Sequence, residues 1–319
     1  MHKWTPLCLF VLTLFPFSSS QAEPVPKFAH LLKAALEGDI NAQFMLGSAY
    51  ELGRGVAPDF AEAARWYQKA ADAGNPGAEA HLGKLYAEGK GLPRDAAAAV
   101  KWYARAAVQG DSQAQTNLGC MYFNGDGGLQ RDYNEAARWF SKAAAQRNPL
   151  AEANLATLYA EGLGLPRDPE KAANLYLEAA KHGNLYSQTR LAWMYEHGIG
   201  RRQDRAESVK WNRVAAQYGY PPALNNLGYL YEHGLGVQRD FPKAAKLYCQ
   251  AADSKLSEAQ HNWGVIQSNA KGLPEDCNEA ARWLTKVAPR GFANASETIE
   301  ADAKGPVSDS TAALASKKH

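Results

Sequence analysis

The fold is decided by the stretch Ala78-Glu-Ala-His-Leu-Gly-Lys-Leu-Tyr-Ala-Glu-Gly-Lys-Gly-Leu-Pro-Arg-Asp95, which continues through Lys101-Trp102-Tyr103 to Ala106-Ala107. The chain of 319 residues repeats this pattern every 36 residues, with one inserted residue near Gly128. Seven registered copies occur, centred on Leu46-Gly47, Leu82-Gly83, Leu118-Gly119, Leu155-Ala156, Leu191-Ala192, Leu227-Gly228 and Trp263-Gly264. Such a period indicates an array of stacked supersecondary units.

The first half of each unit predicts an amphipathic helix, which we call helix A. In the first copy, Ala42, Leu46 and Tyr50 recur at the spacing of one helical face. Gly47 lacks a side chain on that face, so a neighbouring helix can come close. Gly53 can adopt the left-handed conformation that ends a helix, and a tight loop is expected after it.

The second half of each unit predicts a second helix, helix B. An aspartate stands at each expected N-cap, and a glutamate follows three residues later in four units, which is typical of a reciprocal capping box. The seven aspartates are Asp59, Asp95, Asp132, Asp168, Asp204, Asp240 and Asp276. Aromatic residues such as Trp66 and Tyr67 are expected to anchor one helix pair to the next.

The repeated pattern resembles the Sel1-like repeat, a relative of the tetratricopeptide repeat, over roughly residues 28–291. The resemblance implies an all-α, right-handed superhelical solenoid of stacked antiparallel helix pairs. A few units depart from the pattern: Arg147 and Lys255 replace the closing glycine, and Arg201 replaces an apolar loop residue.

The repeats set the expected domain organisation. Residues 1–22 are read as a signal peptide and residues 23–38 as an N-terminal capping helix. Seven repeats of about 36 residues occupy residues 39–291. Residues 292–303 match a C-terminal capping helix, and residues 304–319 have the composition of a disordered tail.

The first residues predict export. Lys3 precedes an apolar run from Leu7 to Phe17, and Ser20-Gln21-Ala22 is a small-x-small cleavage pattern, so cleavage is expected after Ala22. The mature protein is therefore expected in the periplasm or the medium, with no membrane span.

Loss of Lys3 leaves 34 basic against 33 acidic residues, and this near-balance argues against nucleic acid as a partner. A disulfide between Cys249 and Cys277, in neighbouring units, is left open.

A second stripe on helix A is the candidate binding surface. Because the repeats stack, one column of this stripe would form a ladder rich in asparagine, which can bond an extended peptide or sugar hydroxyls. Neighbouring columns add charged, aromatic and histidine side chains. The resemblance implies that helix A faces a concave groove. The candidate residues are Lys84, Asn117, Asn154, Arg190, Trp193, His197, Asn226, Tyr229, His233 and Asn262.

Two alternatives to ligand binding by these residues stay open: a structural role for the asparagines and a metal site at the histidines. The asparagines could bond neighbouring helices and hold the array together instead of meeting a ligand. His197 and His233, one repeat apart, could approach a shared metal ion, but two ligands make a weak site, so no metal is expected.

The leading functional expectation is a non-enzymatic interaction scaffold of the bacterial cell envelope that needs no cofactor. Its expected partner is an envelope or host protein. Whether the ligand is a peptide or a glycan is left open, and so is the oligomeric state. The alternative is a cell-wall or β-lactam hydrolase, by analogy with cysteine-rich Sel1 relatives. Ser268 and Lys271 match a Ser-x-x-Lys string, but no accompanying Lys-Thr-Gly or Ser-Asp-Asn motif is present.

Overall fold

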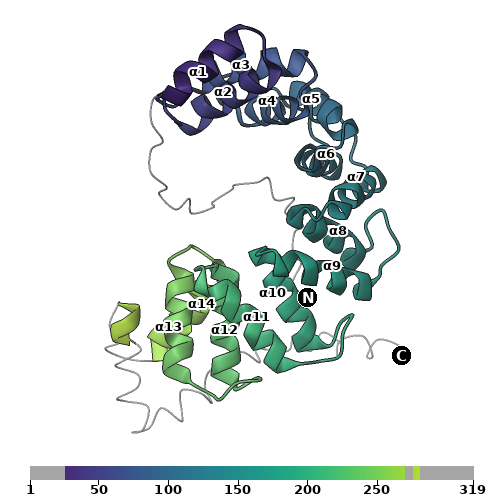
Figure 1. The fold of residues 1–319 in the computed structure, drawn as a ribbon. Coiled ribbons are helices and arrows are strands. Elements are labelled where there is room, and N and C mark those ends of the chain that lie inside the picture. Colours follow the sequence, from purple (N-terminus) through teal and green to yellow (C-terminus); the bar gives the residue numbers. More distant parts are fainter. Residues whose placement is uncertain (1–25, 270–275, 281–319) are drawn as a thin grey trace, which may run out of the picture. The chain divides into compact units, whose positions relative to one another are not determined.

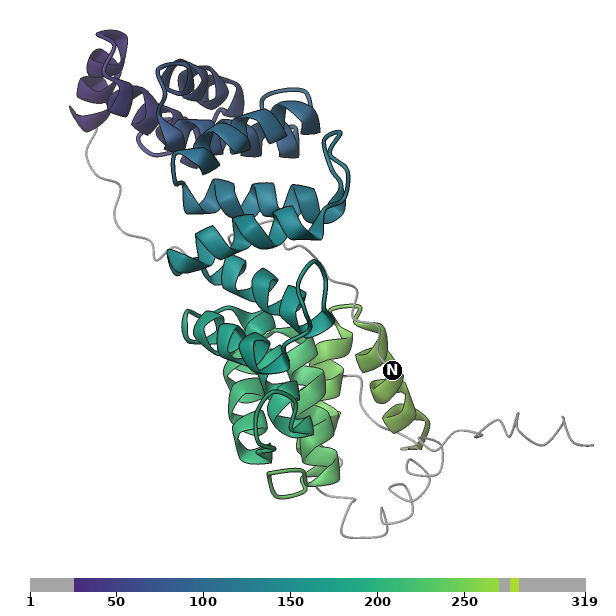
Figure 2. The ribbon, with the colours of Figure 1, turned by 90° about the vertical axis from the view of Figure 1, so that its right-hand side faces the viewer.

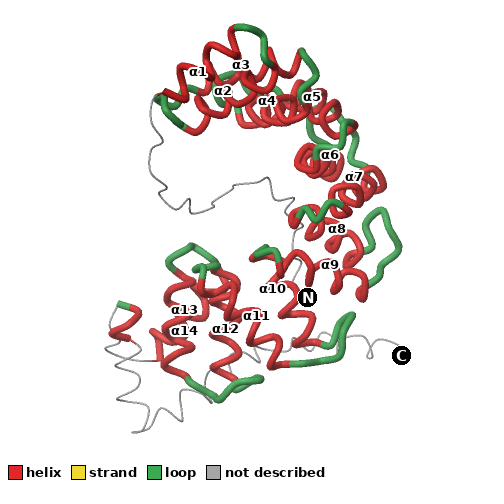
Figure 3. Tube along the Cα trace, viewed as in Figure 1, coloured by secondary structure: helices red, strands yellow, loops and turns green. Residues whose placement is uncertain are grey.

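The structure is a computed structural model that describes residues 26–269 and 276–280. The expected signal peptide, the expected C-terminal capping helix at 292–303 and the expected tail at 304–319 lie outside the described residues. Within the described ranges the secondary structure is helical and contains no strand (Figure 3). The all-α prediction is therefore confirmed.

The helices follow one another at the period that the sequence predicts (Figure 1). A leading helix, α1 (Pro26–Leu36), precedes the repeats, and each repeat supplies a helix A and then a helix B. The A helices are α2 (Ile40–Leu52), α4 (Pro76–Glu88), α6 (Ser112–Asn124), α8 (Pro149–Glu161), α10 (Leu185–His197), α12 (Pro221–His233) and α14 (Ser257–Asn269). The B helices are α3 (Phe60–Asp72), α5 (Ala96–Val108), α7 (Tyr133–Ala145), α9 (Pro169–Lys181), α11 (Arg205–Gln217) and α13 (Phe241–Ala252), and residues 277–280 begin the next one.

The chain divides into two compact units. Of the described residues, the first comprises 26–191 with 199–202, and the second comprises 192–198 with 203–269 and 276–280. Within the first unit, each helix from α1 to α9 packs against the next; within the second, the same holds from α11 to α14 (Figure 2). Each unit is thus a stack of consecutive helix pairs.

A glycine on helix A admits an aromatic ring from helix B of the same repeat. A Cβ atom added at Gly47 would lie 2.6 Å from Tyr67, and one added at Gly83 would lie 2.9 Å from Tyr103. The same contact recurs between Gly228 and Tyr248. Tyr67 and Tyr103 are almost completely buried, so these rings are central to the packing between paired helices.

The aspartate caps are confirmed, but the reciprocal half of the capping box is wrong. Asp59 Oδ1 accepts from the main-chain amides of Ala61 and Glu62, and a side-chain cap forms at all seven predicted aspartates. The Asp59 amide, which the Glu62 side chain was expected to accept from, donates instead to the Tyr50 carbonyl at 2.9 Å. Glu62 is bonded to Arg65 at 2.7 Å. The helix A carbonyl thus takes the place of the glutamate and ties the loop to helix A.

The loop of one repeat lies on helix B of the preceding repeat. A Cβ atom at Gly164, in the loop after α8, would overlap the main chain of Tyr133 at the start of α7. Gly164 also has a φ of 66°, which L side chains rarely adopt. The same overlap with the preceding helix B recurs at Gly91, Gly127, Gly200 and Gly236. This contact fixes how successive repeats approach one another within a unit.

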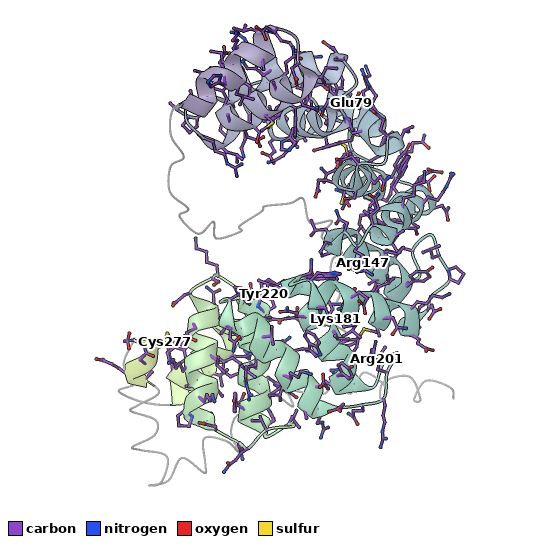
Figure 4. The ribbon with its side chains drawn as sticks, viewed as in Figure 1. Glu79, Arg147, Lys181, Arg201, Tyr220 and Cys277 are labelled. Carbon is purple, nitrogen blue, oxygen red and sulfur yellow. A yellow bond between two sulfur atoms is a disulfide. The ribbon has the colours of Figure 1, made fainter. Side chains whose placement is uncertain are left out.

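The residues that depart from the repeat pattern keep its backbone geometry. Arg147 and Lys255 take φ values of 60° and 61°, the left-handed region that glycine occupies in other repeats. Arg201, labelled in Figure 4, donates from Nη2 to Asn174 Oδ1 at 2.7 Å. Arg147 and Lys255 therefore keep the backbone conformation of the glycine that they replace, and Arg201 adds a side-chain contact to α9.

Cys249 and Cys277 form a disulfide, which the sequence had left open. Cys249 lies on α13, and Cys277, also labelled in Figure 4, opens the helix that follows the undescribed segment 270–275. The bond covalently joins helix B of the sixth repeat to helix B of the seventh.

A buried carboxylate on α2 joins the first two repeats. Glu51 accepts a hydrogen bond from the Tyr67 hydroxyl at 2.6 Å and from the Lys84 ammonium at 3.1 Å, and its Oε2 lies 2.8 Å from His81 Nδ1. Burial by itself would raise the pKa of Glu51, but His81, the Tyr67 hydroxyl and the charge of Lys84 lower it from the usual 4.5 to about 2. The carboxylate is therefore stabilised in its charged form by donors from two repeats.

Replacing Gly164 by Ala should destabilise the array more than replacing Gly183. Both residues have positive φ, but a Cβ at Gly183 meets no atom within 4 Å. We expect Gly183→Ala to cost about 1 kcal/mol from backbone strain alone. Gly164→Ala should cost about 3 kcal/mol, because overlap with Tyr133 is added. Urea unfolding measures both, and equal losses would contradict the proposed loop contact.

Glu51→Gln should lower the free energy of unfolding by about 2 kcal/mol at neutral pH. Because the folded-state pKa of Glu51 is depressed, its contribution is fully present above pH 4.5 and is lost as the pH falls toward about 2. The difference between the variant and the parent should therefore shrink over that interval in urea unfolding. Glu37→Gln, at an exposed ion pair with Lys33, is the control and should change little. A difference that does not vary with pH would contradict the assignment.

Candidate functional site

The ten predicted site residues lie on A helices of both units. Four belong to the first unit, and the other six belong to the second, on the end of α10, on α12 and on α14. The first-unit residues are Lys84, Asn117, Asn154 and Arg190, and the second-unit residues are Trp193, His197, Asn226, Tyr229, His233 and Asn262.

Lys84 and Asn117 line a depression of about 500 Å³ in the first unit. Phe44, Tyr103 and Met121 contribute apolar surface to it. The Lys84 ammonium is already paired with Glu51. The depression combines an apolar lining with a few polar groups, as small binding sites often do.

The asparagine column of the first unit is mostly internal. Asn117 and Asn154 are 7% and 9% exposed. Asn117 Oδ1 accepts from Gln113 Nε2 at 3.1 Å, and Asn154 Nδ2 lies 3.6 Å from Cys120 Sγ. These contacts agree with the structural reading of the column, in which the amides satisfy neighbouring groups and offer little surface to a ligand.

Arg190 is also buried, although it is charged. Its side chain is 7% exposed, its Nη2 lies 3.5 Å from Glu161 Oε1, and its guanidinium lies over the Tyr176 ring at 5.9 Å. Burial would lower the pKa of Arg190, but the neighbouring tyrosines and Glu161 raise it, so the group stays charged. Both Glu161 and Tyr176 belong to the same unit as Arg190.

The second unit presents two aromatic–histidine pairs, one repeat apart. The Trp193 and His197 rings stack with centroids 4.6 Å apart, and the Tyr229 and His233 rings lie 4.2 Å apart. Each histidine Nδ1 lies 2.9 to 3.0 Å from the carbonyl oxygen of its aromatic partner. Because a carbonyl only accepts, Nδ1 carries a proton in both rings. The pairs are thus held in fixed orientations, and Tyr229 is 43% exposed.

The second-unit asparagines again make contacts between helices. Asn226 Nδ2 lies 3.5 Å from Asn212 Oδ1, and Asn262 Nδ2 donates to Asn225 Oδ1 at 2.9 Å. Both Asn226 and Asn262 are partly exposed. They therefore bond neighbouring helices and keep some surface for a ligand.

Glu196 is the residue of this region that the sequence analysis missed. It is half-buried on α10, and its charge acts on both Tyr229 and His233 of the next repeat. Burial raises the pKa of Glu196, and nearby His197, Arg205 and His233 lower it only in part. Burial and the charges of Glu196 and Glu232 likewise raise the pKa of Tyr229, which Arg205 lowers in part.

A signal for Glu196 was present in the repeat register. Its column also contains Glu51 and Glu232, whereas the intervening repeats carry Ala87, Phe123 and Ala160. A carboxylate that recurs on the apolar side of an amphipathic helix indicates a buried or functional charge.

No group of three or more His, Cys, Asp or Glu residues that could hold a metal ion occurs in residues 26–269 and 276–280. Across those same ranges, every helix is too short or too polar to cross a lipid bilayer.

Comparison with solved structures gives two informative likenesses. The crystal structure of c5321, a protective antigen present in uropathogenic Escherichia coli strains and displaying an SLR fold, is 37% identical, with a TM-score of 0.67. The match covers 85% of this chain and 58% of c5321, so this chain spans little more than half of that protein's length. A Sel1 repeat protein from Oxalobacter formigenes is 30% identical, with a TM-score of 0.66, and the match covers 71% of this chain and 90% of that one. No curated protein matches the chain.

The family model of the Sel1 repeat matches the chain in seven consecutive copies. They cover residues 40–75, 76–111, 112–148, 149–184, 185–219, 221–256 and 257–288. Each copy contains one helix A and the helix B, or the start of the helix B, that follows it. With more than half of its length matched, the chain belongs to the Sel1 repeat family.

Proposed function

We propose that the chain is an exported scaffold that holds a partner protein of the bacterial cell envelope on the A-helix surface of its fifth and sixth repeats. The observation that carries the proposal is the pair of aromatic–histidine stacks in the second unit. Sel1 repeats commonly mediate interactions between proteins. Exposed aromatic side chains with fixed orientations lose little conformational entropy on binding, which makes them good anchors for a partner.

Export is supported by the sequence of residues 1–22 and by one relative. The apolar run and the Ser20-Gln21-Ala22 pattern are typical of a cleavable signal peptide. The c5321 protein is a protective antigen, and an exported location would make such a protein accessible to host immunity.

The export proposal predicts a mature chain that begins at Glu23. Mass spectrometry of the chain expressed with its leader should find this N-terminus in the periplasm or the medium. Leu12→Arg should block processing, because it places a charge in the apolar run, whereas Leu12→Ile should be processed normally. A full-length chain that stays in the cytoplasm without either substitution would contradict export.

The scaffold proposal predicts that removal of the exposed Tyr229 ring or the half-buried Trp193 ring weakens binding and spares the fold. Tyr229→Ala and Trp193→Ala should each reduce capture of envelope partners at least about tenfold, as loss of an interface anchor does. Quantitative mass spectrometry after affinity purification from the source bacterium's envelope measures this capture. The helical melting curve should change little.

Tyr218→Ala is the matched control, because Tyr218 is 72% exposed and is the C-cap residue of α11, a helix B. It should capture the same partners as the parent. Recovery of the same partners in equal amounts by the Tyr229 and Trp193 variants would show that the surface is misassigned.

The hydrolase alternative has a separate test. The mature chain should not turn over a chromogenic β-lactam or purified muropeptides. Turnover that is lost in Ser268→Ala would replace the scaffold proposal with an enzymatic one.

A further inference from the structure

The first two repeats show how this array satisfies a carboxylate on helix A. Glu51 receives hydrogen bonds from Tyr67 on helix B of its own repeat and from Lys84 on helix A of the next repeat, and it also contacts His81 there. Its side chain is 7% exposed, and these groups take the place of the water that burial removes. The Lys84 ammonium completes the site with a positive charge.

Glu196 occupies the same register position in the fifth repeat, but its surroundings differ. The positions of Tyr67, His81 and Lys84 are taken there by Asn212, Asn226 and Tyr229. Asn212 Nδ2 donates to the Ser208 carbonyl, and Asn226 Nδ2 is directed to Asn212. Within the described residues, the Glu196 carboxylate accepts no hydrogen bond and forms no ion pair within 4.0 Å.

Glu232, in the sixth repeat, shows that the missing donors are particular to Glu196. The Tyr248 hydroxyl donates to Glu232 Oε2 at 2.6 Å, as Tyr67 donates to Glu51. Glu196 is half-buried without such a donor, and Arg205 acts on it only through its charge. Partial burial disfavours the charged form of the carboxylate, and its oxygens are not closed off from solvent, so a cation from outside can reach and stabilise it.

The aromatic ring that replaces Lys84 suits the same cation. One face of Tyr229 is covered by His233, yet 43% of the residue is exposed. A ring face beside a carboxylate attracts ammonium and guanidinium groups through the ring quadrupole and the full negative charge together. The Glu196 carboxylate and the Tyr229 ring together therefore favour a ligand that carries a positive group on an apolar stem.

We propose that Glu196 and Tyr229 form a binding site for a lysine or arginine side chain of the partner polypeptide, whose charged group occupies the place that Lys84 takes beside Glu51. The site rests on the proposed scaffold function and names the chemistry that the scaffold recognises. The stacked rings of Trp193 and His197 lie on the same helix as Glu196, and we expect them to offer apolar surface to the stem of that side chain.

The test uses the mature chain and four capped pentapeptides of glycine, whose central residue is lysine, arginine, norleucine or Nε-acetyl-lysine. Nuclear magnetic resonance titration follows the imidazole signals of His197 and His233. The lysine and arginine peptides should bind at least about tenfold more tightly than the two neutral peptides. Glu196→Gln, which keeps the size of the side chain and removes its charge, should abolish that preference. Tyr229→Leu should weaken the binding of both cationic peptides.

Two matched controls remove the same groups elsewhere: Glu170→Gln takes a charge from an exposed position on α9, and Tyr218→Leu removes an exposed ring. Neither should change peptide binding. Equal binding of the lysine and norleucine peptides, a preference that survives Glu196→Gln, or no signal change up to about 10 mM peptide would each overturn the proposal.

Partner capture separates this proposal from the function on which it rests. If Glu196→Gln captures envelope partners normally while Tyr229→Ala does not, the scaffold function stands and the cation site is wrong. If all variants capture equally, the scaffold surface itself is wrong.

Discussion

The small residue at one position of helix A, glycine in five repeats and alanine at Ala156 and Ala192, is the constraint on which the rest of the array depends. Four of the glycines let an aromatic ring of helix B lie against the helix A backbone, where an added Cβ atom would overlap the ring; they are Gly47, Gly83, Gly119 and Gly228. That contact brings the two helices of a repeat together around a buried ring. A second glycine, in the loops after α4, α6, α8, α10 and α12, lets the loop lie against the first turn of the preceding helix B. Small residues at these two positions thus allow both the pairing of helices within a repeat and the stacking of successive repeats.

The stack in turn decides which side chains can meet a partner. Because stacked repeats keep the same register, a residue on one helix A is a neighbour of the equivalent residue on helix A of the next repeat in the same unit. In the first two repeats, equivalent positions hold the ion pair of Glu51 and Lys84. In the fifth and sixth repeats, the same positions hold the Glu196 carboxylate, which has no ion pair within the described residues, and the Tyr229 ring. Substitution on a fixed backbone changes recognition without changing the fold.

The helices, the aspartate caps and the family could all be predicted from the sequence, because each depends on residues close together in the chain. The reciprocal capping box was wrong because the Tyr50 carbonyl, nine residues before Asp59, competes for the same amide. The burial of Asn117 depends on how neighbouring helices pack, which a column of equivalent positions does not contain. The surroundings of Glu196 could not be predicted for the same reason. They depend on Asn212 and Tyr229, which lie on other helices and far from Glu196 in the sequence.

Site-specific photo-crosslinking in the intact source bacterium tests the central claim most directly. A photoreactive phenylalanine analogue is placed at position 229, and in a separate strain at position 218, and the cells are irradiated. The account predicts one discrete crosslinked polypeptide from position 229 and none from position 218. It also predicts that the crosslink maps next to a lysine or arginine of that polypeptide. No crosslink at position 229, or the same products from both positions, would contradict the claim that this surface holds a partner.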